Sequence, residues 1–268
     1  MLRTMSHATR VMRTIAAAAA IALPAIPVAG AQDSRPVVVV FTFTNSSLGA
    51  GKADFDGIST GVQDLLITDM ASSAKIRLVD RARIAELLQE QKMVKDQQID
   101  PATAVRLGKI IGAQYAVTGG FLSDGKGKAV LTARTIDLET SAIANPEKIE
   151  GSSGEVLALI GQLSSKLSSG MSLAAKPGRR VGEAGDAAKP AAAPAQTGAP
   201  ASNVEQYARA VSPKSMQMKL DGATLKIYSN ALDEMDRKNK TKAADLFKQV
   251  LAKYPDFEPA QNHLKKVG

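Results

Sequence analysis

The sequence predicts an α/β fold in which helices flank a mixed sheet, followed by a disordered linker and a small all-α hairpin. Before residue 174, short β-branched runs alternate with segments whose apolar residues recur at helical spacing. Residues 174–203 are rich in Ala, Pro and Gly and have no apolar periodicity, which is typical of a linker. Helical spacing then returns. We therefore expect an α/β domain over residues 32–173 and a helical domain over residues 204–268.

The predicted order of elements in the first domain is β-α-β-α-α-β-β-β-α. The run Val37–Phe41 is mostly β-branched and predicts a buried strand, and the apolar spacing over residues 55–70 predicts a helix. Asp100 and Pro101 form a strong helix start, and Gly112 is placed to end that helix. The remaining predicted elements are strands at 76–79, 115–121, 129–136 and 143–149, and helices around 84–88 and 156–167.

The helical domain is predicted to contain three helices. One apolar face runs over residues 223–235 and a second over residues 243–254. Thr241 is expected to cap the second helix, and Pro255 is expected to end it. Asp256 is then placed to cap a short third helix.

The first 31 residues have the three parts of a secretory signal peptide. Three arginines precede an almost wholly apolar run at 15–28, and no acidic residue occurs before Asp33. A small-x-small cleavage pattern then ends at Ala31. That run is too short to span a membrane. A buried core helix is the alternative, because Ala-rich runs can be buried, but the charges favour the signal peptide. We expect export and a mature chain that starts at Gln32, located in the periplasm with or without association with the outer membrane.

The composition excludes several classes of function. The chain has no cysteine, so it forms no disulfide and carries no acylated cysteine. Its net charge of +8 falls by three to +5 once the three Arg of residues 1–31 are removed, which is too weak and dispersed for nucleic-acid binding. His263 is the only histidine of the mature chain and is expected in solvent. The usual nucleophile–base and zinc sites are therefore missing, and we expect no catalytic residue, cofactor or metal.

One pattern suggests a phosphate-binding loop but fails on inspection. Residues 49–52 (GAGK) follow a predicted strand. That loop would need glycine in place of Ser46 and a hydroxyl residue in place of Ala53. Nucleotide binding is therefore not expected.

The acidic residues near the first predicted helix indicate no metal site. Asp54 and Asp56 lack the ladder of further ligands that a calcium loop needs, and they are expected to cap the helix. Asp64 and Asp69 are expected on its polar face. A hydrolase with paired carboxylates remains an alternative, although no pair is singled out.

The α/β segment resembles the CsgG-like family, named for the curli assembly component, over roughly residues 36–170. The most distinctive stretch is residues 104–120 (AVRLGKIIGAQYAVTGG), and Arg81 matches a characteristic arginine that follows a strand. The further segments that carry the resemblance are 37–41, 57–66, 76–81, 84–91 and 134–140. The resemblance implies a mixed sheet with helices and a role in the cell envelope. Relatives serve in surface-fibre secretion, flagellar assembly and activation of peptidoglycan synthases.

Two departures from the pore-forming members bear on function. Those members hold a lipid anchor, whereas this chain has no cysteine. They also carry long insertions that supply membrane-crossing hairpins, whose strands need about 9–11 residues. Between Phe121 and Ala129 there are only seven residues, rich in Gly and Lys, and residues 144–155 are polar. A pore role is therefore disfavoured.

The tail resembles a tetratricopeptide hairpin over residues 223–256. Ala243, Phe247 and Pro255 stand at that family's spacing, and Ala231 fits its small position. A plain helical hairpin with a packed seam is the alternative. One repeat cannot bury its faces alone, so the tail is expected to be marginal or to dock on something. The residues expected to bind a partner through this hairpin are Tyr228, Met235, Phe247, Leu251 and Tyr254.

The function expected from these observations is a non-enzymatic, periplasmic or outer-membrane-associated component that binds proteins in the assembly of the cell envelope or of surface structures. Its expected partners are other envelope proteins or a second copy of the chain, with no nucleic acid and no direct membrane span. The alternative is a subunit of a curli-type secretion channel.

Overall fold

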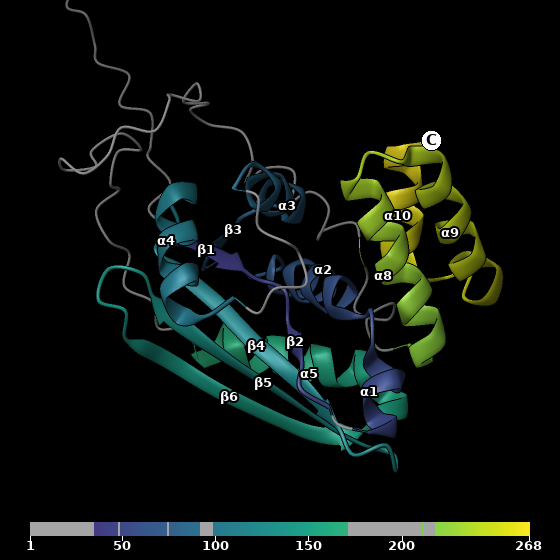
Figure 1. Ribbon diagram of the computed structural model, residues 1–268, viewed down its shortest axis with the longest axis horizontal. Coiled ribbons are helices and arrows are strands. Elements are labelled where there is room, and N and C mark those ends of the chain that lie inside the picture. The colour runs from purple at the N-terminus through teal and green to yellow at the C-terminus, as the bar shows by residue number, and fades with distance from the viewer. Residues whose placement is uncertain (1–34, 48, 74, 92–98, 171–210, 212–217) are drawn as a thin grey trace, which may run out of the picture. The chain divides into compact units, whose positions relative to one another are not determined.

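A mixed sheet forms the centre of the protein, as predicted, and its strand order is β3-β1-β4-β5-β6 (Figure 1). The sheet has six strands rather than the five expected, because β2 also pairs with β4. The pairs β1–β3, β1–β4 and β2–β4 are parallel, and β4–β5 and β5–β6 are antiparallel. The strands are β1 (Val37–Val40), β2 (Thr44–Asn45), β3 (Arg77–Leu78), β4 (Tyr115–Ser123), β5 (Lys128–Asp137) and β6 (Ile143–Ser152).

The computed structural model describes residues 35–47, 49–73, 75–91, 99–170, 211 and 218–268, all within one compact unit, 34–268. The predicted signal peptide (1–31) and the predicted linker (174–203) lie outside the described residues. The division of the chain into domains therefore stays a prediction.

Helices cover both faces of the sheet at β1, which is apolar on both sides. Val38 and Val40 belong to one buried cluster, with α2 (Ser59–Met70) and α5 (Val156–Gly170). Val39 and Phe41 belong to a second cluster, with α3 (Arg81–Glu90) and α4 (Pro101–Ile111). Successive side chains of a strand point to opposite faces, so a run of apolar residues indicates burial on both. This confirms the buried strand predicted at Val37–Phe41.

Helices α3 (Arg81–Glu90) and α4 (Pro101–Ile111) begin at capping aspartates. The Asp80 carboxylate accepts from the Ala82 N–H at 2.7 Å, and that of Asp100 accepts from the Thr103 N–H at 2.9 Å. Gly112 ends α4 in the left-handed conformation, with φ 78°. The predicted start and end of α4 are thus confirmed.

The helix predicted over residues 55–70 is in fact two helices, α1 (Ala50–Phe55) and α2. Gly57, with φ 77°, breaks the chain between them. The N-cap of α2 is Ile58, without a side-chain cap hydrogen bond, so the prediction that Asp54 and Asp56 cap this helix is wrong. The GAGK sequence enters α1, where a Cβ on Gly51 would lie 2.5 Å from the Ser123 carbonyl oxygen. Glycine is therefore needed there for close packing.

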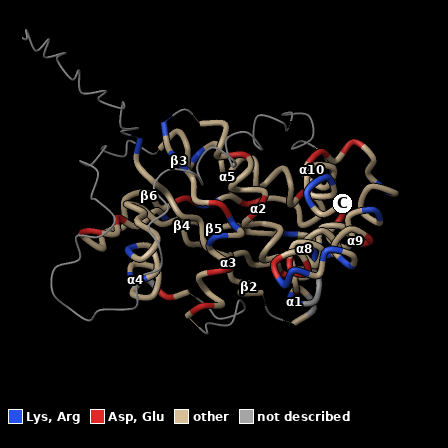
Figure 2. The backbone as a smooth tube through the Cα atoms, turned by 90° about the horizontal axis from the view of Figure 1, so that it is seen from above, with Lys and Arg blue, Asp and Glu red and all other residues tan. Residues whose placement is uncertain are grey.

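Three helices follow at the C-terminal end, as predicted: α8 (Gly222–Asp236), α9 (Lys240–Lys253) and α10 (Glu258–Val267). Their boundaries differ from those expected, because α9 begins before Thr241 and the N-cap of α10 is Phe257 rather than Asp256. Blue and red residues are interspersed over these helices in Figure 2. No helix among the described residues is long and apolar enough to cross a membrane.

Candidate functional site: a buried charge cluster between α2 and the C-terminal helices

Helix α8 packs closely along α2 because the contact residues are small. The Gly61 N–H donates to the Ser229 hydroxyl oxygen at 3.1 Å, and the Thr60 hydroxyl donates to Asp233 Oδ1 at 2.9 Å. A Cβ on Gly61 would lie 3.3 Å from atoms of Leu225 and Ser229. Glycine at this position therefore allows the two helices to approach. The tail thus docks on the α/β part of its own chain.

A cluster of charged side chains lies at this contact, centred on the Asp64 carboxylate of α2. Its Oδ1 accepts from Arg81 Nε at 3.2 Å, and its Oδ2 accepts from the Tyr228 hydroxyl at 2.6 Å. The Nε2 of His263 lies 3.1 Å from the same Oδ2. The Arg81 Nη1 donates to Asp236 Oδ2 at 2.6 Å. Five side chains from α2, α3, α8 and α10 therefore meet in one network.

The network is shielded from water. The side chains of Arg81, Asp64 and Asp236 are 5, 7 and 1 % exposed. Burial alone would raise the pKa of Asp64, but the neighbouring His263 and Arg81 and the hydrogen bond from Tyr228 hold it well below its usual range. Burial alone would lower the pKa of Arg81, whereas the carboxylates of Asp236 and Asp64 raise it. Each charge is thus stabilised by the others.

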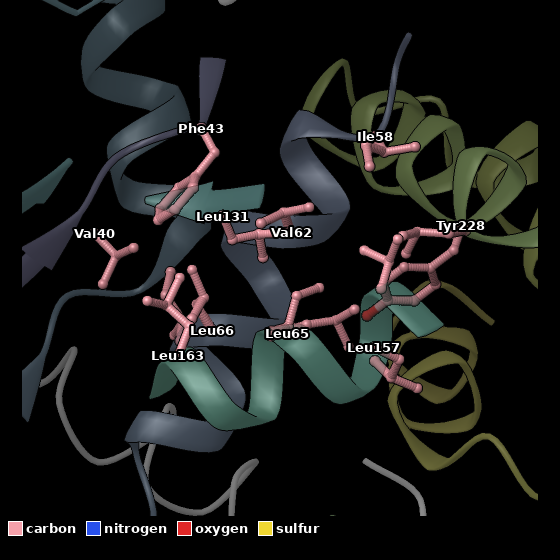
Figure 3. Close-up of a cluster of buried hydrophobic side chains, with 14 of the residues drawn as sticks. Val40, Phe43, Ile58, Val62, Leu65, Leu66, Leu131, Leu157, Leu163 and Tyr228 are labelled. Atoms are coloured by element: carbon pink, nitrogen blue, oxygen red, sulfur yellow. The ribbon is translucent and has the colours of Figure 1, made fainter. Parts of the chain in front are cut away.

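Aromatic rings enclose the imidazole side of the cluster. Phe247 of α9 stacks on His263, with ring centroids 5.5 Å apart and an interplanar angle of 11°. Tyr228 meets Phe247 edge-on at 5.9 Å and Phe257 at 5.2 Å. Figure 3 shows the Tyr228 side chain among buried residues of α2 and α5, near Leu65 and Leu157. The apolar core of the C-terminal helices is continuous with that of the sheet.

Two sequence-based expectations about this region are wrong. His263 is 4 % exposed and Asp64 is 5 % exposed, so neither lies in solvent or on a polar helix face. A signal existed for His263, because it stands three residues after Ala260 and four before Val267, on the apolar face of α10. Asp64 has no such signal, because Gln63 precedes it and Thr60 and Thr68 lie four positions away on the same face of α2. The sequence marks Arg81 only through the family resemblance, and no pattern in it singles out Asp236.

The residues predicted to bind a partner lie mostly within the tail's own packing. Tyr228 and Phe247 are fully buried. Met235, Leu251 and Tyr254 are half-buried and pack against the same core. The Tyr254 hydroxyl donates to Asp221 Oδ2 at 2.8 Å. Their role in binding another protein stays a prediction.

The cluster contains groups that serve as acids, bases and anion ligands in enzymes, but it is arranged to hold two parts of the fold together. Both oxygens of Asp64 are engaged, and the groups around them are buried. A general base must be within reach of a substrate proton, whereas these atoms face one another. Within the described part of the chain, no group of three or more acidic or histidine residues could hold a metal ion.

Acid is expected to weaken this contact. Because the pKa of Asp64 is lowered from its ordinary value of 3.8, its contribution to stability is complete above that value and is lost as the pH falls below it. We expect the difference in unfolding free energy between the wild type and Asp64→Asn to shrink as the pH falls below about 4. Urea unfolding at several pH values measures it. A difference that does not shrink between about pH 4 and about pH 2 would contradict this assignment.

The described residues form a mixed α/β fold that is extended by helices docked on α2. A model of the family described as curli production assembly/transport component CsgG matches residues 22–123, which is less than half of the chain. The match runs from within the predicted signal peptide to the end of β4. The C-terminal helices lie beyond it, and the tetratricopeptide resemblance is not confirmed.

Several solved structures are similar to part of the chain. The LpoB C-terminal domain from Salmonella enterica has 16 % identity, covers 44 % of this chain and 82 % of its own, and has a TM-score of 0.37. Lipoprotein GNA1162 from Neisseria meningitidis has 14 % identity, coverages of 51 and 99 %, and a TM-score of 0.39. A PelC dodecamer from Paraburkholderia phytofirmans has 15 % identity, coverages of 51 and 88 %, and a TM-score of 0.29. Values this low establish no shared function. No curated protein matches the chain.

Proposed function

We propose that the protein is a non-enzymatic component of the cell envelope that is exported to the periplasm and binds other envelope proteins during assembly of envelope or surface structures. The match of the CsgG family to residues 22–123 carries this proposal. The signal-peptide features of residues 1–31 support export. The charged groups of the buried cluster are paired with one another where the tail contacts α2. This arrangement favours a binding role over catalysis.

The docked tail limits where a partner can bind. The α2 surface around Gly61 is covered by α8, so a partner must use other parts of the molecule. The uncovered polar residues of β5, such as Thr132 and Arg134, are exposed and lie on a rigid sheet. A photo-crosslinking amino acid at Thr132 is a suitable reporter, and the same group at buried Tyr228 is its matched control.

Export is the first test of this function. We expect the chain produced in its native host to be recovered from the periplasm without detergent, with a mature N-terminus at Gln32. A variant without residues 2–31 is expected to stay in the cytoplasm. N-terminal sequencing and cell fractionation measure both. A retained N-terminus, or recovery only in detergent, would contradict the proposal.

Binding is the second test. In the exported chain, the crosslinker at Thr132 is expected to form adducts with envelope proteins, whereas the crosslinker at Tyr228 is not. The cytoplasmic variant is expected to give no such adducts. Equal adducts from Thr132 and Tyr228 would contradict the binding role. So would the absence of adducts from Thr132 and from every other exposed residue of β5.

A further inference from the structure

Strand β6 is the last strand of the sheet, and no described strand pairs with its outer edge (Figure 1). On the inner side, the Ser153 N–H that follows β6 donates to the Gly127 carbonyl at 2.9 Å. Backbone groups alternate in direction along a strand. The backbone groups of the even-numbered residues from 146 to 152 therefore point outward.

This edge carries two opposite charges on one face. Lys148 and Glu150 form an ion pair within the strand, with side chains 60 and 62 % exposed. A surface ion pair of this kind contributes little to stability, so its members can exchange partners at low cost. Pro146 stands at an outward position, where proline is tolerated because it removes no donor from the sheet.

We propose that two copies of the chain associate by antiparallel pairing of their β6 edges, about a two-fold axis at Ile149. Lys148 of each copy then lies directly across from Glu150 of the other. Their outward N–H and C=O groups form reciprocal hydrogen bonds. Farther out, the Ser152 N–H donates to the Pro146 carbonyl, which uses the only backbone hydrogen-bonding group that proline has.

The charges select this register. A two-fold antiparallel pairing sets the central residue against its own copy. An axis at Glu147, Lys148 or Glu150 would place like charges directly opposite one another, which is destabilising. An axis at Ile149 instead creates two pairs of opposite charges. The two-fold arrangement also closes on itself, so it yields a dimer and no longer assembly.

The pairing extends the existing core. Ile149 is 5 % exposed and faces the side of the sheet that α5 covers. A Cβ on Gly151 would lie 2.5 Å from Leu159 Cδ2, which shows how closely α5 approaches this edge. Pairing would bring the α5 helices of both copies over one continuous sheet.

Charge exchange tests the proposal. In sedimentation velocity, the mature chain is expected to show a monomer–dimer equilibrium, and Lys148→Glu or Glu150→Lys is expected to raise the dissociation constant about tenfold. The double variant with both substitutions restores the opposite pairing and is expected to dimerise as the wild type does. A wild-type chain that stays monomeric at its highest soluble concentration would overturn the proposal, as would single variants that dimerise unchanged.

Cysteine crosslinking tests the register. The natural chain has no cysteine, so the background is clean. Directly opposite residues in a hydrogen-bonded antiparallel pair have Cα atoms about 5.5 Å apart, which suits a disulfide. An equimolar mixture of Lys148→Cys and Glu150→Cys is expected to form crosslinked dimers under mild oxidation. Each variant alone places its cysteines diagonally, beyond easy reach, and is expected to crosslink much less. Equal crosslinking in all three samples would overturn the register.

Discussion

Replacement of Arg81 by Met is expected to lower the free energy of unfolding by about 3–5 kcal/mol. The Arg81 guanidinium lies between Asp64 and Asp236, at 3.2 and 2.6 Å, and all three side chains are almost fully buried. Removing the cation leaves two carboxylates without their main compensation in a region that excludes water. Removing one partner of a buried ion pair lowers the free energy of unfolding far more than the intact pair raises it, because the remaining charge is left buried and uncompensated.

Urea unfolding followed by circular dichroism measures this effect. Arg83→Met is the matched control, because Arg83 lies in the same helix and forms an exposed ion pair with Glu86, so its loss is expected to change stability little. Adding Asp64→Asn and Asp236→Asn to Arg81→Met is expected to recover part of the loss, since the uncompensated charges are then gone. Equal stability of the Arg81 and Arg83 variants would show that the cluster does not hold the fold together.

Replacement of Phe247 by Ala is expected to cost about 3–5 kcal/mol and to loosen α8, α9 and α10 together. The ring is fully buried and is in contact with both Tyr228 and His263. Those two residues are in turn partners of Asp64. The loss is therefore expected to extend to α2 rather than to stay within the tail.

Hydrogen exchange resolves the two regions. In Phe247→Ala, we expect reduced protection in α2 as well as in the C-terminal helices. Lys248→Gln is the control, because its side chain is 66 % exposed and lies one position along the same helix. Loss of protection in the C-terminal helices alone would mean that the tail is an independent unit, and that docking contributes little to the stability of the α/β part.

Local rules were sufficient to predict most of the elements but not the site. The buried run Val37–Phe41 and the start of α4 at Asp100 follow from neighbouring residues. Strand β2 has only two residues, which is too short for an alternating pattern to be recognised. The break before α2 depends on Gly57 adopting a positive φ, which a sequence pattern does not reveal. Elements of this kind are fixed by the surrounding structure.

The charge cluster could not be predicted because its members come from distant parts of the chain. Asp64 meets residues 164 and 199 positions away, across a segment of linker composition. A polar residue at a helix surface is indistinguishable from a solvated one until the helix that covers it is known. Periodicity describes which face of a helix is apolar, whereas docking decides which polar residues are buried.

The long separation between Asp64 and His263 also determines when the fold can be completed. During synthesis, Asp64 exists long before the residues that satisfy its second oxygen, so a nascent or truncated chain holds a carboxylate that must remain hydrated. The Asp64 position on α2 can therefore be covered only after α8 and α10 have been made. The cost of closing so long a loop grows slowly with its length, so a distant C-terminal segment can still perform this step. The cluster forms only in a chain that includes α8 and α10. In a chain truncated before them, α2 is expected to stay exposed and accessible to proteases.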